Sequence, residues 1–228
     1  MEESLEKEII RIVVRSVVFE GWSNSLIKTA CLELGIEDKV FKNLFPRGVI
    51  DIAVASHRDG DKKMVKILEG KDFDGVKTRE KITFAIKSRL EVVQNEKEFV
   101  KKTMSFFSLP QNFLDGNQLI WGTSDTIWNF FGDQSNDYNY YTKRLILSGV
   151  YGSVVLFWLS DGSKDNSSTW EFLDRRIQNV MSFESFKTKV KADSYIYKNL
   201  KLPRQILSKI KKPSDKNNWN VPGTRRSS

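Results

Sequence analysis

The sequence predicts an all-α protein. Apolar residues recur at intervals of three and four along most of its 228 residues, which is the spacing of one helix face. No stretch shows the alternating pattern of a β-strand, and no internal repeat is visible. Apolar residues make up 39% of the chain and aromatic residues 12%, so it has the length and the apolar content to fold around a core.

Residues 1–60 are expected to form four helices in an arrangement like a helix-turn-helix. The first is expected over residues 4–20. The second is capped by Ser23 and stopped by Gly35, and the third covers residues 37–44. The fourth begins at Arg47-Gly48, after Pro46, and runs to about residue 57.

A break or kink is expected at Asp59-Gly60-Asp61, because glycine between two aspartates disfavours a helix interior. Residues 61–186 then form a helical central region, in which Ser168 and Glu171 have the spacing of a capping box. The helices expected in this region cover residues 62–69, 77–94, 95–107, 111–132, 137–160 and 168–186.

The positive charge of the chain is confined to its C-terminal tail. Residues 1–60 carry a net charge of −2, residues 61–186 are neutral, and residues 187–228 carry +10. We expect a basic amphipathic helix over residues 187–212, with a solvated basic tail as the alternative, and disorder over 213–228. A basic and apolar helix of this kind binds anionic membrane surfaces. The expected membrane-contact residues are Ile196, Leu200, Ile206, Leu207 and Ile210.

The N-terminal order of Gly21-Trp22, Leu34-Gly35 and Phe45-Pro46 resembles that of TetR-family transcription repressors. DNA affinity comes largely from Lys and Arg that neutralise phosphates. Here the reading helix would start with Glu37-Asp38, in a region of net negative charge. DNA binding is therefore not the favoured function, and we interpret the motif as a retained scaffold.

No catalytic or metal-binding pattern is visible in the sequence. The one histidine, His57, has no partner motif, and a single cysteine, Cys31, forms neither a disulfide nor a CxxC zinc site. The acidic loop at residues 133–137 lacks the Gly and Glu that an EF-hand needs, because Tyr138 and Arg144 stand at those positions. We therefore predict no catalytic residue, no metal and no enzymatic activity.

A dense group of aromatic residues lies between residues 121 and 158. Large aromatic side chains can line a site for a bulky apolar ligand, and ordinary core packing is the alternative interpretation. The residues predicted to bind lipid are Trp121, Trp128, Phe131, Tyr141, Tyr151 and Trp158.

Three segments carry a more specific signal: DTIWNFFGDQSNDYNYYTKR at residues 125–144, LSGVYGSVVLFWLSD at 147–161, and TWEFLDRRIQNVM at 169–181. Their residue order resembles the ninth member of the Coq protein series, a family of lipid-binding accessory proteins of ubiquinone biosynthesis. That family has a TetR-like fold, which accounts for the repressor-like N-terminal pattern.

The resemblance implies a non-enzymatic protein that binds isoprenoid quinone intermediates or phospholipid at a membrane. It would present the quinone to the di-iron demethoxyubiquinone hydroxylase and need no cofactor beyond this lipid ligand. The implied partner-binding residues are Asp161, Trp170, Leu173 and Arg176. A homodimer is also expected. The alternative function is a TetR-type repressor with an apolar inducer.

The start of the chain, MEESLEKEII, lacks the basic and apolar segments of a secretory signal, and a lone cysteine suits a reducing compartment. We therefore expect a bacterial cytoplasmic protein that docks on the inner membrane, with a processed mitochondrial matrix form as the alternative.

Overall fold

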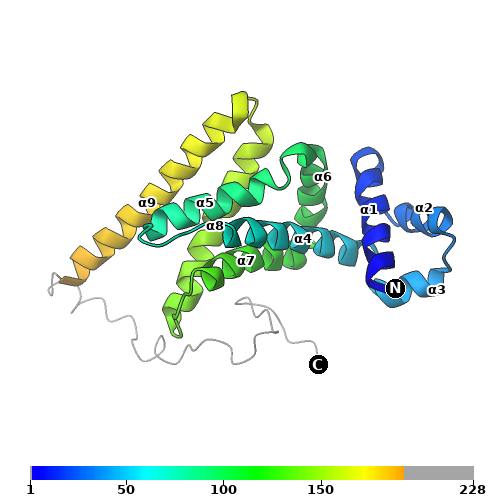
Figure 1. Ribbon diagram of the computed structural model, residues 1–228, viewed down its shortest axis with the longest axis horizontal. Coiled ribbons are helices and arrows are strands. Elements are labelled where there is room, and N and C mark those ends of the chain that lie inside the picture. Colours follow the sequence, from blue (N-terminus) through cyan, green and yellow to red (C-terminus); the bar gives the residue numbers. More distant parts are fainter. Residues whose placement is uncertain (1, 193–228) are drawn as a thin grey trace. The chain divides into compact units, whose positions relative to one another are not determined.

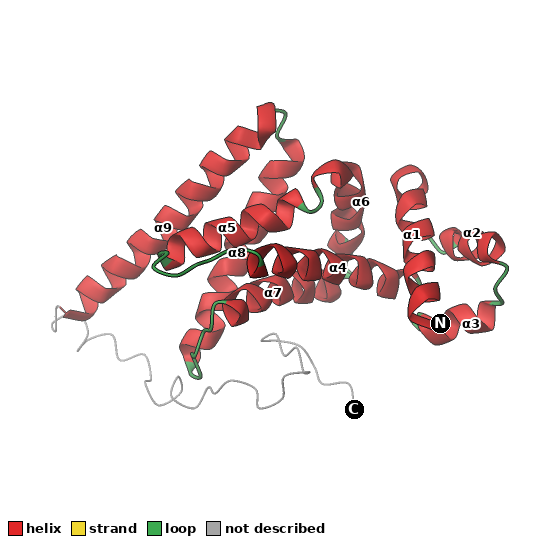
Figure 2. Ribbon diagram, viewed as in Figure 1, coloured by secondary structure: helices red, strands yellow, loops and turns green. Residues whose placement is uncertain are grey.

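The computed structural model describes residues 2–192, with side chains described over residues 5–180 (Figure 1). Every regular element in this part of the chain is a helix, which confirms the predicted all-α class (Figure 2). The chain divides into two compact units. Within the described residues, the first comprises residues 2–70 and 88–119, and the second comprises residues 71–87 and 120–192.

The first unit begins with the expected helix-turn-helix-like elements: α1 (Glu2–Glu20), α2 (Ser25–Leu34) and α3 (Asp38–Leu44). The expected cap at Ser23 is wrong, because Asn24 precedes α2 and makes no side-chain cap, while the Ser23 hydroxyl lies 2.6 Å from that of Ser25. Gly35 ends α2 with a φ of 62°, a left-handed conformation that glycine adopts without strain. The buried apolar residues that join these helices include Ile9, Val13, Val17, Leu26, Ala30, Phe41 and Phe45.

Helix α4 (Val49–Glu69) is continuous, so the expected break at Asp59-Gly60-Asp61 is wrong. Gly60 instead provides room for Arg89 of α5 (Thr78–Glu91), because a Cβ atom on Gly60 would lie 2.6 Å from the Arg89 Cζ. The buried Arg89 guanidinium donates to Asp61 at 2.7 Å and to the carbonyl oxygen of His57 at 3.1 Å. The Gly-Asp pair is therefore a packing site for an arginine and not a helix stop.

His57 lies beside this ion pair, with its ring 3.9 Å from Asp61 and 18% exposed. Burial lowers the pKa of His57 from 6.5 to about 4, and the positive charges of Arg89 and Arg58 add to this, against the opposing effects of Asp61 and the Leu119 backbone. The ring is therefore neutral in the folded protein at pH 7. His57 thus lies inside α4 and not at the helix end that the sequence predicts near residue 57.

Because the pKa of His57 is lower in the folded protein, the unfolded chain binds a proton more readily. The contribution of the neutral His57 ring to the free energy of unfolding is fully present above the unfolded pKa of 6.5. It is lost progressively as the pH falls toward 4. We expect the His57 contribution to fall by about 2 kcal/mol between pH 7 and pH 5. Urea unfolding of the wild type and of His57→Gln at both pH values measures this contribution as the difference between the two proteins. An equal loss in the two proteins would contradict the assignment.

Trp22 packs against a further helix of the first unit. Its ring lies 5.9 Å from Phe99 and 5.6 Å from Phe106 of α6 (Lys97–Ser108), and its Nε1 donates to Thr103 at 3.0 Å. A short 3-10 turn (Gln94–Glu96) precedes α6. Helix α7 (Phe113–Phe130) starts in this unit and ends in the second.

The second unit contains the end of α7, α8 (Tyr138–Ser160), a 3-10 turn (Lys164–Asn166) and α9 (Ser167–Ala192). Helices α8 and α9 pack against each other on either side of the 161–166 turn (Figure 1). Within residues 2–192, no helix is both long enough and apolar enough to cross a membrane. Apart from its first residues, 187–192, which belong to α9, the expected membrane-contact helix lies outside the described residues, as does the expected disordered tail.

Candidate functional site

The candidate site is built on the corner between α7 and α8, within the second unit. Asp137 starts α8, where its carboxylate accepts hydrogen bonds from the backbone and side-chain nitrogens of Asn139 at 2.9 and 3.0 Å. Such an acidic N-cap satisfies a free N–H group at the helix start. The Asp-x-Asn part of the 125–144 segment therefore has a structural role, which sequence reasoning did not assign.

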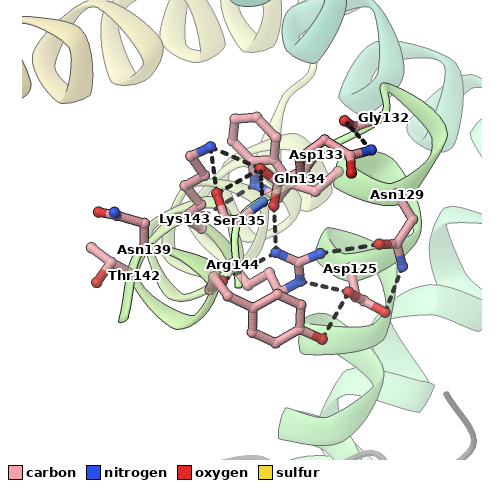
Figure 3. A network of polar contacts seen from close by, with 12 residues as sticks. Asp125, Asn129, Gly132, Asp133, Gln134, Ser135, Asn139, Thr142, Lys143 and Arg144 are labelled. Carbon is pink, nitrogen blue, oxygen red and sulfur yellow. Dashed lines mark hydrogen bonds and ion pairs between the residues drawn. The ribbon is translucent and has the colours of Figure 1, made fainter. Parts of the chain in front are cut away.

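Arg144 is fully buried and joins the two helices (Figure 3). Its guanidinium forms ion pairs with Asp125 on α7 and with Asp133 in the connecting loop, the latter at 2.9 Å. It also donates to Asn129 and to the carbonyl oxygen of Tyr140, both at 3.1 Å, and it lies 3.6 Å from the Tyr140 ring centroid. A planar fork with several donors suits this multiple contact.

Asp133 receives a second cation, because Lys143 Nζ lies 2.8 Å from Asp133 and 2.9 Å from the Ser135 hydroxyl (Figure 3). Burial by itself would raise the pKa of Asp133. Hydrogen bonds from Lys143, Arg144 and Ser135 outweigh burial, so the pKa of this carboxyl lies well below its usual range. These groups hold the corner together, and each forms a hydrogen bond or an ion pair with another member of the network.

The structure divides the predicted lipid-binding aromatics into two sets. Trp121, Tyr151 and Trp158 are at most 4% exposed and belong to the core. Trp128, Phe131 and Tyr141 are half-buried and reach the surface. Trp121 and Tyr141 do meet, with ring centroids 6.1 Å apart.

Phe131 belongs to an aromatic cluster that sequence reasoning missed in part. Phe73, in the loop between α4 and α5, lies 5.1 Å from Phe131, 6.4 Å from Phe130 and 5.7 Å from Phe84, measured between ring centroids. The Lys71 ammonium lies 3.7 Å from the Phe84 ring centroid. A lone phenylalanine between turn residues is the one sequence signal that could have indicated Phe73. The cluster presents half-buried aromatic rings beside a cation, which suits an apolar ligand with a polar or anionic head.

The implied partner-binding residues differ in how exposed they are, and one of them lies in the core. Leu173 is fully buried and packs in the core. Trp170 is half-buried, donates from Nε1 to the Asp165 carbonyl oxygen at 2.9 Å, and has Lys87 5.1 Å from its ring. Arg176 is exposed and lies over the Phe172 ring at 4.9 Å. Trp170 and Arg176 are six residues apart and therefore about 120° apart around α9.

Asp161 has a structural role at the α8–α9 turn. Its carboxylate accepts from the backbone nitrogens of Ser163 and Thr169 at 2.8 and 2.9 Å, and also from the Thr169 hydroxyl. Although burial acts to raise the pKa of Asp161, these hydrogen bonds hold it well below its usual range. The expected Ser168–Glu171 capping box is wrong. Helix α9 starts at Ser167, and Asp161 satisfies its free N–H group.

The membrane-contact residues Ile196, Leu200, Ile206, Leu207 and Ile210 lie outside the described residues. Within the described residues, no group of His, Cys, Asp and Glu side chains is arranged to hold a metal ion.

Comparison with known proteins places these features in context. A family model described as COQ9 matches residues 115–184, which include the α7–α8 corner and the α8–α9 turn. The probable ubiquinone biosynthesis protein coq9 of Dictyostelium discoideum, a mitochondrial protein, is 28% identical over 91% of this chain and 68% of its own length. The mitochondrial ubiquinone biosynthesis protein COQ9 of Rattus norvegicus is 26% identical and that of Homo sapiens 25%, each over 84% of this chain.

This chain spans 63% of the rat protein and 62% of the human protein. Among solved structures, a TetR transcriptional regulator from Nitrosomonas europaea matches 77% of this chain and 97% of its own, with a TM-score of 0.62 and 16% identity. That likeness shows the fold alone. The predicted resemblance to the COQ9 family, and with it the TetR-like fold, is therefore confirmed.

Proposed function

We propose that this protein is a non-enzymatic accessory protein of ubiquinone biosynthesis that binds isoprenoid quinone intermediates at a membrane. It presents them to the demethoxyubiquinone hydroxylase. The observation that carries the proposal is the COQ9 match over residues 115–184, the part of the chain that holds the buried Arg144 network and the surrounding aromatic residues.

The half-buried aromatics support an apolar ligand. Phe131, Phe73 and Phe84 form one group of half-buried rings. Tyr141, which packs beside the buried Trp121, forms a second half-buried aromatic site. The Arg144 network fixes α7 relative to α8, and with them the positions of Phe131 and Tyr141. Rigid aromatic side chains of this kind bind apolar molecules at a small entropic cost.

The charge of the helix-turn-helix-like surface opposes the repressor alternative. Residues Glu37 and Asp38, at the start of α3, are exposed, and so is Leu32 of α2, at 83%. DNA phosphates would meet these carboxylates and an apolar side chain, and the two exposed lysines of α3, Lys39 and Lys42, only balance the two acidic charges. The TetR-like fold is therefore interpreted as a scaffold for lipid binding.

We infer the compartment from the relatives and not from the start of the chain. The three relatives described above are named as mitochondrial. We therefore favour the mitochondrial alternative over the bacterial cytoplasm, with the protein bound peripherally to the membrane that contains its quinone ligand.

Native mass spectrometry with lipid extraction tests the proposal on protein purified from cells that make ubiquinone. We expect an isoprenoid quinone intermediate to co-purify with the wild type. Phe131→Ser should reduce the occupancy of the quinone about tenfold, because it removes a ring from the half-buried aromatic cluster. The control is Leu156→Ser, an equally polar change at an exposed site on α8.

Three other outcomes contradict the proposal. A protein that stays lipid-free when offered quinone would show that the aromatics are ordinary core residues. Phospholipid as the sole bound lipid would contradict quinone presentation. Equal losses in Phe131→Ser and Leu156→Ser would remove the Phe131 cluster from the binding site.

A further inference from the structure

The corner between α6 and α7, in the first unit, exposes an unusual amount of apolar surface. We define the α6–α7 corner as Leu109, Pro110, Phe113 and Leu114. Leu109 is 43% exposed, Phe113 54% and Leu114 59%, and Pro110 between them is also exposed. Four exposed apolar residues within six positions differ from the single exposed leucines that occur on most proteins, and Gln111 is the one exposed polar residue among them.

This exposure does not come from a loosely packed loop. Asn112, in the middle of the corner, is 3% exposed and donates from Nδ2 to the Phe106 carbonyl oxygen at 3.0 Å. Its backbone nitrogen donates to Leu109 at 2.9 Å, and its carbonyl oxygen accepts from Gly116 at 3.1 Å. Gly116 allows α7 to approach α6 closely, since a Cβ there would lie 2.8 Å from the Phe107 Cβ. The corner is therefore held rigidly with its apolar side chains outward.

The corner carries no unpaired charge. From residue 103 to residue 117 the one ionisable side chain is Asp115, which pairs with Arg47 at 2.8 Å. Transfer of the four corner residues out of water would therefore remove apolar surface from solvent without desolvating an isolated charge. The next charged side chains along α6 are Lys101 and Lys102.

The size of the patch limits what can bind it. Three large side chains, each about half exposed, offer on the order of 300 Å². A stable interface between proteins buries roughly 800 Å² on each partner and needs a polar rim. The corner falls short of this, whether the partner is a second copy or another protein. A few apolar residues at a rigid tip are sufficient for insertion into the interfacial region of a bilayer.

We propose that the α6–α7 corner inserts into the membrane surface as an apolar lipid contact, separate from the basic C-terminal tail. The inference rests on the proposed function, because a protein that presents membrane-dissolved quinones must remain on the bilayer. The tail supplies a charge-dependent attraction that salt screens. The corner supplies an attraction that depends on neither salt nor anionic lipid.

An environment-sensitive nitrobenzoxadiazole label on the full chain tests insertion. Cys31 is buried, and burial together with Asp38 raises the pKa of its thiol, so an introduced cysteine is labelled selectively. The labelled variants are Leu114→Cys in the corner and Lys39→Cys, an exposed control on α3. We expect severalfold brighter fluorescence at position 114 alone when phosphatidylcholine vesicles are added.

A second measurement uses sedimentation with the same vesicles. In about 0.5 M salt, where electrostatic attraction is screened, Phe113→Ser combined with Leu114→Ser should lower the partition coefficient about tenfold. Deletion of residues 193–228 should instead lower binding to phosphatidylglycerol vesicles at low salt. The dependence of binding on salt and on anionic lipid therefore distinguishes the contribution of the corner from that of the tail.

Each other result overturns the proposal in a distinct way. Vesicle binding with no brightening at position 114 would overturn insertion of the corner and leave the proposed function intact. No binding to any vesicle would overturn both. Equal brightening at positions 114 and 39 would show general adsorption. Brightening at position 114 without vesicles, rising with protein concentration, would show that the corner binds a second copy.

Discussion

Replacement of Arg144 by methionine is expected to lower the free energy of unfolding by about 3–5 kcal/mol, because it removes a buried cation that pairs with both Asp125 and Asp133 and leaves Asp133 with the Lys143 cation alone. Asp133 is 2% exposed at its side chain and receives a guanidinium nitrogen at 2.9 Å. Asp125 also loses its ion pair, and Asn129 its donor. The Arg144→Met side chain would fill much of the space but satisfy none of these oxygens.

Chemical unfolding followed by far-ultraviolet circular dichroism measures this loss. The matched control is Arg175→Met on α9, where the arginine is 58% exposed and lies 3.8 Å from Glu171. An exposed pair of this kind contributes little, so the control should change stability by less than about 1 kcal/mol. Arg144→Lys should fall between the two, because it keeps the charge but not the planar fork. Equal stability of Arg144→Met and Arg175→Met would contradict the structural role.

The same network predicts the direction of acid sensitivity. The pKa of Asp133 is lowered in the folded protein, so its stabilising contribution is present above its unfolded pKa of about 4 and is lost as the pH falls below it. This loss occurs at lower pH than the loss assigned to His57, which starts near pH 6.5. The contribution of the Asp133 carboxylate to stability can therefore be separated from that of the His57 imidazole by unfolding the protein at a series of pH values.

Local sequence patterns were sufficient for much of the fold. Gly21, Gly35 and Pro46 end helices in the sequence and do so in the structure, because each of these residues acts through its own backbone. Helical periodicity likewise located α8 to within one residue at its start and with no error at its end. These features depend on neighbours that are close along the chain.

The failures concern contacts between residues far apart in the sequence. Gly60 looks like a helix stop until Arg89, 29 positions later, is packed against it. Phe73 joins Phe131 across 58 positions. Periodicity gives the face of a helix but not the neighbour that covers it. The interface role of Leu173 was implied by the family resemblance alone, and in this chain the side chain lies in the core.

Gly60→Ala is expected to destabilise the protein by about 2–4 kcal/mol, although alanine is the better helix former. The new Cβ would lie 2.6 Å from Arg89 Cζ and 2.7 Å from both terminal nitrogens. An exposed arginine would move aside at small cost. Arg89 is 4% exposed and is fixed by Asp61 and the His57 carbonyl oxygen, so its displacement breaks a buried ion pair.

Gly149→Ala provides the matched control, because it makes the same substitution within a helix. Gly149 is exposed on α8, and a Cβ there would meet nothing within 4 Å. Relief of the conformational entropy of glycine should then stabilise the protein by about 0.5–1 kcal/mol. The two substitutions are thus expected to act with opposite signs, and urea unfolding at pH 7 measures both.

The Arg89→Met background tests whether the cost of Gly60→Ala comes from the arginine. The Arg89→Met substitution removes the three atoms nearest to the new Cβ, so Gly60→Ala should then cost less than about 1 kcal/mol. An undiminished cost in that background would mean that Gly60 is required for another reason. Stabilisation by Gly60→Ala in the wild type would show that Arg89 does not occupy this position, and would return residues 59–61 to the helix break that their sequence suggests.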